Sequence, residues 1–206
     1  MKDIILIGAF HEMVELCEDS GLRIAGIIDN ECKGAFYGYP ILGTDADAAR
    51  IHLKYPECHA VLTPDPPGTR RKLEGIYRSA GFSFINVIHP GATVSRYARI
   101  GEGTIIQNGV NVSANCTIGS FCKLNTRCNV MHDNVIGDYT TIAPNAVLLG
   151  YVSVGSMSYI GANSTVLPHC NIGNDVMIGA GAVVTKDVVD TLVMAGVPAR
   201  IIVKQD

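Results

Sequence analysis

The chain has 206 residues, a formal net charge of −3, 48% hydrophobic residues and 17% charged residues. These values are typical of a globular protein of one or two domains, and the lack of a basic excess argues against nucleic acid as a partner. Residues 1–30 contain no long apolar stretch like that of a signal peptide, and no later apolar run is long enough to cross a bilayer. We therefore expect no membrane partner.

Residues 1–84 alternate between predicted strands and predicted helices. Strands are expected at Asp3–Gly8, Arg23–Asp29, His59–Thr63 and Ser83–Val87, and helices at His11–Ser20, Asp45–Tyr55 and Thr69–Ala80. This alternation favours a small Rossmann-like parallel sheet with helices on both faces, a truncated form of the nucleotide-binding architecture. In such folds, ligands bind at the carboxyl ends of the strands.

Two loops at those strand ends are candidate ligand sites. The first, Gly8–His11, leads into the first helix, and the amides at the start of a helix can receive a phosphate. The second contains Asp29, Asn30 and Lys33, and a carboxylate there can accept hydrogen bonds from a base or a ribose. A capped turn without a ligand is the alternative for each loop, and spacing alone favours that alternative.

Every sixth residue from 88 to 184 is aliphatic. The series has seventeen members: Ile88, Val94, Ile100, Ile106, Val112, Ile118, Leu124, Val130, Ile136, Ile142, Leu148, Val154, Ile160, Val166, Ile172, Ile178 and Val184. A period of six fits a chain that runs straight, presents one aliphatic and one small residue inward, and turns a corner at Gly or polar residues. Three such sides close a coil of about 18 residues, and stacked coils place residues 18 apart over one another.

The seven cysteines show no disulfide pattern. Four of them, Cys116, Cys122, Cys128 and Cys170, occupy the small inward positions of the repeat, where a thiol packs as a small hydrophobe. The other three have no pairing logic, so we expect free thiols rather than disulfides or a zinc site. A reducing cytoplasm is the expected location.

The repeat resembles the hexapeptide pattern of left-handed parallel β-helix acyltransferases. Four further motifs resemble those of bacterial sugar acetyltransferases, a family that includes nucleotide-diphospho-4-amino-sugar N-acetyltransferases and sialic acid O-acetyltransferases. These motifs lie at Ile28–Gly43, Gly81–Ser95 (GFSFINVIHPGATVS), Met131–Asp138 (MHDNVIGD) and Ala195–Arg200 (AGVPAR). The resemblance implies a nucleotide-sugar-binding Rossmann-like domain at 1–84 and a left-handed β-helix acetyltransferase domain with a carboxyl-terminal tail at 85–206.

The resemblance also implies which residues meet the nucleotide sugar. They are Gly8, Ala9, Phe10, His11, Asp29, Asn30 and Lys33. The first loop departs from the family pattern, because Phe10 precedes His11 and the second and third glycines are absent. A phosphate can therefore approach this backbone less closely, and the identity of the nucleotide stays open.

His132 is the candidate general base. It lies two residues after the inward Val130, at a corner, and the neighbouring Asp133 offers a carboxylate that can orient an imidazole and stabilise its protonated form. Gly150 follows His132 by one coil, so its N–H is a candidate donor to the oxyanion of an acyl-transfer intermediate. An exposed corner histidine without a catalytic role is the alternative.

The resemblance adds expected contacts to acetyl-CoA. Asn125 matches a polar family position near the acyl group, and Thr141 stands where many relatives have a second histidine. Lys186, Arg200 and Lys204 are candidates for the phosphates of CoA. No metal is expected, because the positions stacked on His132 carry no second imidazole.

The expected reaction is transfer of an acetyl group from acetyl-CoA to the amine of a nucleotide-linked amino sugar, such as a UDP-4-amino-sugar, for bacterial surface glycan synthesis. O-acetylation of a sugar hydroxyl, as in the sialic acid enzymes, is one alternative, and a non-catalytic sugar-nucleotide-binding scaffold is another. The resemblance implies a cytoplasmic homotrimer whose sites lie between subunits.

Overall fold

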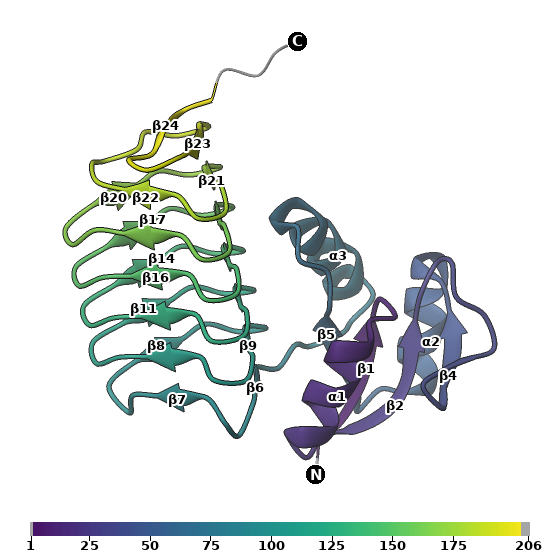
Figure 1. Cartoon of the computed structure of the whole chain (residues 1–206). Coiled ribbons are helices and arrows are strands. Elements are labelled where there is room, and N and C mark those ends of the chain that lie inside the picture. The colour runs from purple at the N-terminus through teal and green to yellow at the C-terminus, as the bar shows by residue number, and fades with distance from the viewer. Residues whose placement is uncertain (1, 203–206) are drawn as a thin grey trace. The chain divides into compact units, whose positions relative to one another are not determined.

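The computed structural model describes residues 2–202 and divides between Pro90 and Gly91 into two compact units, which are described separately (Figure 1). The boundary expected from the sequence, after residue 84, falls inside the first unit.

The first unit contains a sheet with strand order β3-β4-β2-β1-β5. Its strands are β1 (Asp3–Ile7), β2 (Arg23–Ile28), β3 (Ala35–Phe36), β4 (Tyr39–Gly43) and β5 (His59–Leu62). Its helices are α1 (His11–Asp19), α2 (Ala48–Lys54), which follows the 3₁₀ turn η1 (Asp45–Asp47), and α3 (Pro67–Ser79). Strands β4, β2, β1 and β5 run parallel, and β1 is almost completely buried, as expected for a central strand covered on both faces. The alternation of strands and helices agrees with the sequence analysis.

Two features of the first unit differ from the expectation. The strands β3 and β4 form an antiparallel hairpin that the sequence analysis missed, because its turn residues Tyr37 and Gly38, both with positive φ, lack the usual Asn-Gly or Asp-Gly signal. The expected strand at Ser83–Val87 was wrong. Only one bridge joins Phe84 to Ala60, and the two-residue strand β6 (Val87–Ile88) follows.

The second unit is a β-helix of two-residue strands that recur every six residues and form three parallel faces. The first face has β7 (Thr93–Val94), β10 (Asn111–Val112), β13 (Asn129–Val130), β16 (Val147–Leu148), β19 (Thr165–Val166) and β22 (Val183–Val184). The second face has β8 (Arg99–Ile100), β11 (Thr117–Ile118), β14 (Val135–Ile136), β17 (Ser153–Val154) and β20 (Asn171–Ile172). The third face has β9 (Ile105–Ile106), β12 (Lys123–Leu124), β15 (Thr141–Ile142), β18 (Tyr159–Ile160) and β21 (Met177–Ile178), and is continued by β23 (Val193–Ala195) and β24 (Arg200–Ile201).

Each coil pairs with the next at a separation of eighteen residues. Val112 lies beside Val130, and Val130 lies beside Leu148. The aliphatic residues of the repeat from Ile106 to Val184 are buried in one continuous core, together with Cys116, Cys122 and Cys128. The predicted β-helix and its 18-residue coil are therefore confirmed, and the repeated parallel strands fit the left-handed form of the fold.

Each corner from the one between β8 and β9 to the one between β21 and β22 has one residue in the left-handed conformation. These residues recur every sixth position with φ between 53° and 69°: Gly103, Gly109, Asn115, Phe121, Arg127, Asp133, Tyr139, Asn145, Tyr151, Met157, Asn163, His169, Asp175 and Gly181. Large side chains thus occupy positions where the sequence analysis expected Gly or polar residues. The conformation costs a non-glycine residue about 1–2 kcal/mol, so the hydrogen bonds between coils must hold these corners in place.

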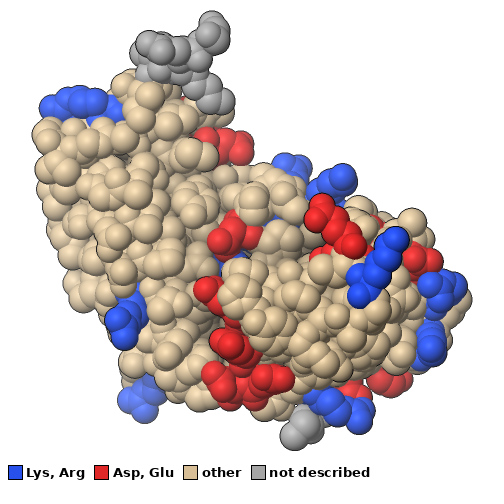
Figure 2. All heavy atoms as spheres, turned by 45° about the vertical axis from the view of Figure 1, so that its right-hand side comes forward, with Lys and Arg blue, Asp and Glu red and all other residues tan. Residues whose placement is uncertain are grey.

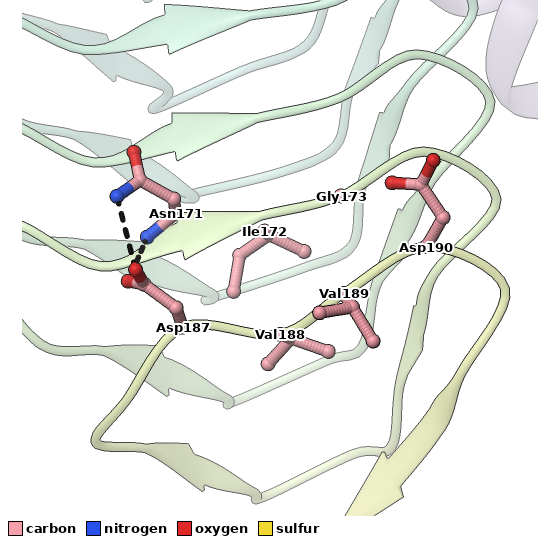
Figure 3. Close-up of a pocket in the computed structure, with 7 residues that line it drawn as sticks. All are labelled: Asn171, Ile172, Gly173, Asp187, Val188, Val189 and Asp190. Atoms are coloured by element: carbon pink, nitrogen blue, oxygen red, sulfur yellow. Dashed lines mark hydrogen bonds between the residues drawn. The ribbon is translucent and has the colours of Figure 1, made fainter.

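The final coil is shortened. Val188 bridges to Ile172, but the contacts around it span sixteen residues instead of eighteen. The carboxylate of Asp187 accepts hydrogen bonds from the backbone and the side chain of Asn171, and Asp190 lies at the other end of the same segment (Figure 3). Side-chain carboxylates thus replace part of the backbone pairing, and the aliphatic repeat ends here. No helix within residues 2–202 has the length and apolar character that a bilayer crossing requires.

Candidate active site

His132 lies at the corner that joins β13 on the first face to β14 on the second. Gly150 occupies the same position one coil later, and the amide of Tyr151 donates to the carbonyl of His132 over 3.1 Å. The imidazole lies directly over Gly150, because a Cβ atom at residue 150 would be 2.6 Å from Cε1 and 2.9 Å from Nε2 of His132. The expectation that residues 132 and 150 share a corner is confirmed.

Gly150 makes room for the His132 ring, and its backbone N–H is also free to bind an acceptor. In the part of the chain that the structure describes, no acceptor receives the Gly150 N–H. A free backbone N–H beside an imidazole is the arrangement that can stabilise an oxyanion while the imidazole moves a proton.

Asp133 holds the other side of the imidazole. Its Oδ2 lies 2.9 Å from Nδ1 of His132, and its Oδ1 accepts a hydrogen bond of 3.2 Å from Nδ2 of Asn115. The hydrogen bond with His132, followed by that with Asn115, holds the pKa of Asp133 below its usual value. The carboxylate is therefore ionised at neutral pH and accepts the Nδ1 proton, which leaves the lone pair of the neutral imidazole on Nε2.

Two aromatic rings extend this corner. Tyr151 meets the His132 ring edge-on, with centroids 5.3 Å apart, and stacks on His169 at 4.9 Å with an angle of 5° between the planes. The sequence analysis did not select Asn115 or Tyr151. Both lie eighteen residues from Asp133, so the rule that paired residues 132 and 150 could have found them.

Asn125 and Thr141 lie away from this corner. Asn125 follows β12 of the third face at a different corner, and Thr141 belongs to β15 of that face. Asn125 is buried, and its Nδ2 has no hydrogen-bond partner among the described residues. Within one chain, therefore, neither Asn125 nor Thr141 lies at the His132 corner.

Lys186 and Arg200 line one cavity of about 450 Å³. Lys186 also occupies the His132 corner position three coils later, through the pairing of β13, β16, β19 and β22. With about 4.8 Å per coil, the two positions are about 14 Å apart along the edge. Lys204, the third cation expected near CoA, lies outside the described residues.

A second cavity, of about 260 Å³, lies in the first unit at the carboxyl ends of β1 and β2. Three of the predicted nucleotide-sugar residues, Gly8, Asp29 and Asn30, line it. Asp45, Thr69 and Lys72 also line it, although the sequence analysis did not select them. The residues around the cavity do not include the predicted Ala9, Phe10, His11 and Lys33.

Asp29 shapes the loops around this cavity. Its Oδ2 accepts the amide of Ala9, and its Oδ1 accepts those of Glu31 and Cys32, each over 2.8 Å. Burial opposes ionisation, but the amides of Cys32, Ala9 and Glu31 outweigh it and hold the pKa of Asp29 below its usual value. These contacts are those of a capped turn, and they leave Asp29 with little spare capacity to bind a base or a ribose.

Gly8 and Asn30 also have structural roles. Gly8 has φ +100°, and a Cβ there would collide with Oγ1 of Thr63. Asn30 donates from Nδ2 to Asp45 over 2.8 Å and accepts the amide of Asp45 over 3.0 Å, while the hydroxyl of Tyr77 donates to the same carboxylate. The polar groups that face the cavity are thus preorganised by the loops themselves.

Within residues 2–202, no three His, Cys, Asp or Glu side chains are grouped so as to hold a metal ion.

Comparison with known proteins matches residues 151–186 to the family model described as bacterial transferase hexapeptide (six repeats). No curated protein sequence matches the chain.

Several solved structures match almost the whole chain. PerB from Caulobacter crescentus, in complex with CoA and GDP-perosamine, is 32% identical, with a TM-score of 0.92 and 98% of each chain covered. A GDP-perosamine N-acetyltransferase from the same organism, with one histidine replaced by alanine, is 31% identical with a TM-score of 0.94, covering 99% of this chain and 98% of that one. The acetyltransferase domain of PglB from Neisseria gonorrhoeae is 28% identical with a TM-score of 0.92, covering 98% of this chain and all of that one.

Proposed function

Because this chain belongs to the bacterial hexapeptide-repeat sugar acetyltransferases, we propose that it transfers an acetyl group from acetyl-CoA to the amino group of a nucleotide-linked amino sugar. The enzyme is an acyltransferase, and acetyl-CoA is its cosubstrate. The observation that carries the proposal is the imidazole of His132, held at Nδ1 by an ionised carboxylate and lying over the free amide of Gly150.

The reaction proceeds by direct attack. The unprotonated amine of the sugar attacks the thioester carbonyl, and Nε2 of His132 takes the proton that the nitrogen loses as the tetrahedral intermediate forms. The negative charge on the former carbonyl oxygen is stabilised by the Gly150 N–H. Collapse of the intermediate breaks the C–S bond, and the departing CoA thiolate receives the proton from the imidazolium. Asp133 stays ionised throughout and keeps the ring oriented.

An amine is the favoured acceptor over a hydroxyl. An unprotonated amine is already a nucleophile, so the base is needed only as the bond forms, whereas a hydroxyl requires more help. Thr141, in place of a second histidine, can donate a hydrogen bond but cannot share a proton at neutral pH. The structures of PerB and of the perosamine N-acetyltransferase, each with GDP-perosamine bound, support the same choice.

The first unit is proposed to be a Rossmann-like domain that binds the nucleotide part of the acceptor. The support is the cavity at the carboxyl ends of its parallel strands, where ligands bind in folds of this kind. Lys72 is the cation on its lining and is suited to a phosphate, while the carboxylate of Asp45 is suited to hydrogen-bond donors of a base or sugar. The nucleotide itself is left to experiment.

A cytoplasmic homotrimer with sites between subunits is the proposed assembly. Asn125 can act on the same acetyl-CoA as His132 only if it comes from another copy, because one chain holds the two residues at different corners. The stacked coils also expose apolar side chains, among them Val135 of the second face and Tyr151 at the corner that leads into it, and show few charges in the view of Figure 2. Such a surface is suited to association with further copies.

The test is a thiol-release assay with acetyl-CoA and a panel of UDP-, GDP-, dTDP- and CMP-linked amino sugars, with free sialic acid as the hydroxyl acceptor. One amino sugar should support turnover, and His132→Gln should lower kcat by about 100-fold or more. His59→Gln, a histidine substitution in the first unit, is the matched control and should leave kcat unchanged. Turnover with sialic acid alone would favour the O-acetyltransferase alternative. Binding of a nucleotide sugar without thiol release would favour the scaffold, and an unchanged rate for His132→Gln would refute the mechanism.

A further inference from the structure

Asn115 is the residue that contacts the far oxygen of the Asp133 carboxylate. It lies one coil before Asp133, at the same corner position, and both residues adopt the left-handed conformation, with φ of 61° and 60°. Its Nδ2 donates to Oδ1 of Asp133 over 3.2 Å, while Oδ2 of the same carboxylate faces Nδ1 of His132 at 2.9 Å. Three side chains from two coils thus form one chain of hydrogen bonds that ends at the imidazole.

Asn115 can keep the Asp133 carboxylate from rotating, which Asp133 cannot do alone. A carboxylate on an exposed corner can rotate about its terminal torsion, which is broad and roughly two-fold for Asp. A donor fixed on one oxygen removes that freedom, and the plane of the carboxylate then keeps the other oxygen in line with Nδ1. The nitrogen of a histidine that carries the proton is set by the partner of the other nitrogen. Fixing Asp133 therefore fixes the Nδ1–H form and leaves Nε2 as the basic atom.

We propose that Asn115 is a positioning residue of this enzyme, which sets the tautomer of His132 by holding the carboxylate of Asp133. The expected effect of Asn115 on the rate rests on the proposed function. Its expected effect on the tautomer of His132 does not. Asn115 touches neither the imidazole nor, on the proposed path, the reacting atoms.

Other polar groups meet at the same corner. The hydroxyl of Tyr151 also contributes to the stabilisation of the Asp133 carboxylate, and His169 stacks on the Tyr151 ring. Asn115 is the side chain that donates directly to Oδ1. Loss of Asn115 should therefore loosen the carboxylate without removing its charge.

The variant Asn115→Gly tests the proposal, because glycine adopts the left-handed conformation without strain and the backbone is kept. Asn163→Gly is the matched control. Asn163 has the same residue type and a similar φ of 56°, at a corner that follows the third face. Both variants should fold like the parent protein and lose similar amounts of thermal stability.

The primary measurement is ¹⁵N NMR of the imidazole nitrogens, with the His132 signals identified as those missing in His132→Gln. In the parent protein and in Asn163→Gly, the neutral ring should carry its proton on Nδ1. In Asn115→Gly, the signals should shift towards a mixture with the Nε2–H form. In steady-state kinetics kcat should fall about tenfold, with KM for acetyl-CoA unchanged.

The outcomes separate the two proposals. An Nδ1–H ring in Asn115→Gly like that of the parent would overturn the inference, whether or not kcat falls. A shift in Asn163→Gly as large as that in Asn115→Gly would also overturn it. A shift confined to Asn115→Gly in a protein that transfers no acetyl group would uphold the positioning role and refute the proposed function instead.

Discussion

At the scale of single residues, the site depends on an absent side chain as much as on those present. Gly150 gives the His132 ring a flat surface and offers an amide without an acceptor in the described part of the chain. The 18-residue rule placed these two residues together from the sequence alone. The same rule places Asn115 beside Asp133, but it could not predict which imidazole nitrogen faces Asp133 or that Asn115 donates to its carboxylate, because side-chain torsions determine both.

We expect Gly150→Ala to lose activity without losing stability. The new Cβ would lie 2.6 Å from Cε1 of His132, so the ring must move, and a displacement of about 1 Å can cost about 100-fold in rate. The backbone of Gly150 does not require a positive φ, so alanine should change the unfolding free energy by less than about 1 kcal/mol. Thiol release and thermal unfolding measure the two effects.

Gly137→Ala is the matched comparison. A Cβ there would lie 2.5 Å from the backbone nitrogen of Ser156, so a coil must shift, and we expect a loss of about 1–3 kcal/mol. A kcat of Gly150→Ala close to that of the parent would show that the ring does not need its present position.

Asp29 provides a second residue-scale prediction, which depends on pH. Asp29→Asn places an amide where three backbone N–H groups require acceptors, so the unfolding free energy of the protein should fall by about 1–3 kcal/mol at pH 7. The pKa of Asp29 is lowered in the folded protein, so its carboxylate stabilises the fold above the unfolded value of about 3.9 and loses this effect as the pH falls through the lower folded value. Urea unfolding should therefore give the same difference at pH 7 and pH 5. A difference that vanished between those two values would contradict this role.

At the scale of elements, the β-helix was predictable and parts of the first unit were not. Aliphatic residues recur every six positions from Ile88 to Val184, and this spacing alone predicts where the strands, the corners and the core lie. The β3–β4 hairpin gave no such signal, since β3 has two residues and its turn is Tyr-Gly. The lining of the cavity at the carboxyl ends of β1 and β2 was only partly predictable, because Asp45 and Lys72 reach it from segments far apart in the sequence.

The corners give the element-scale prediction. Asn145 is exposed and adopts φ of 58°, a conformation that asparagine tolerates better than alanine. Asn145→Ala should lower the unfolding free energy by about 1 kcal/mol, whereas Asn145→Gly should be nearly neutral. Urea denaturation of both variants is the measurement. Equal effects would mean that the side chain, and not the backbone conformation, matters at this corner.

At the scale of the whole molecule, the separation of His132 from Asn125 is the main consequence of the three-faced fold. Both residues are expected to act in one site, yet they lie at different corners of one chain. The sequence revealed the period but not how copies meet, because association depends on outward side chains that the repeat does not constrain.

Mixed assemblies test the shared site. His132→Gln and Asn125→Ala should each be nearly inactive alone. Co-refolding them in equal amounts should restore activity at about a quarter of the sites, where an Asn125→Ala copy supplies His132 and a His132→Gln copy supplies Asn125. Light scattering should report a trimer for each variant and for the mixture. A mixture as inactive as its parts would place both residues in the site of one subunit.

The repeat also fixes the distances between residues that share an edge of the β-helix. His132 and Lys186 share one edge because whole coils separate them, so removing a complete coil between them would bring the two closer by about 4.8 Å and keep them aligned. Removing six residues, which form one side of a coil, would instead place Lys186 on a neighbouring edge. If Lys186 binds CoA as expected, the number of coils beyond the histidine sets the length of cosubstrate that this edge accommodates, and that length can change only in whole coils.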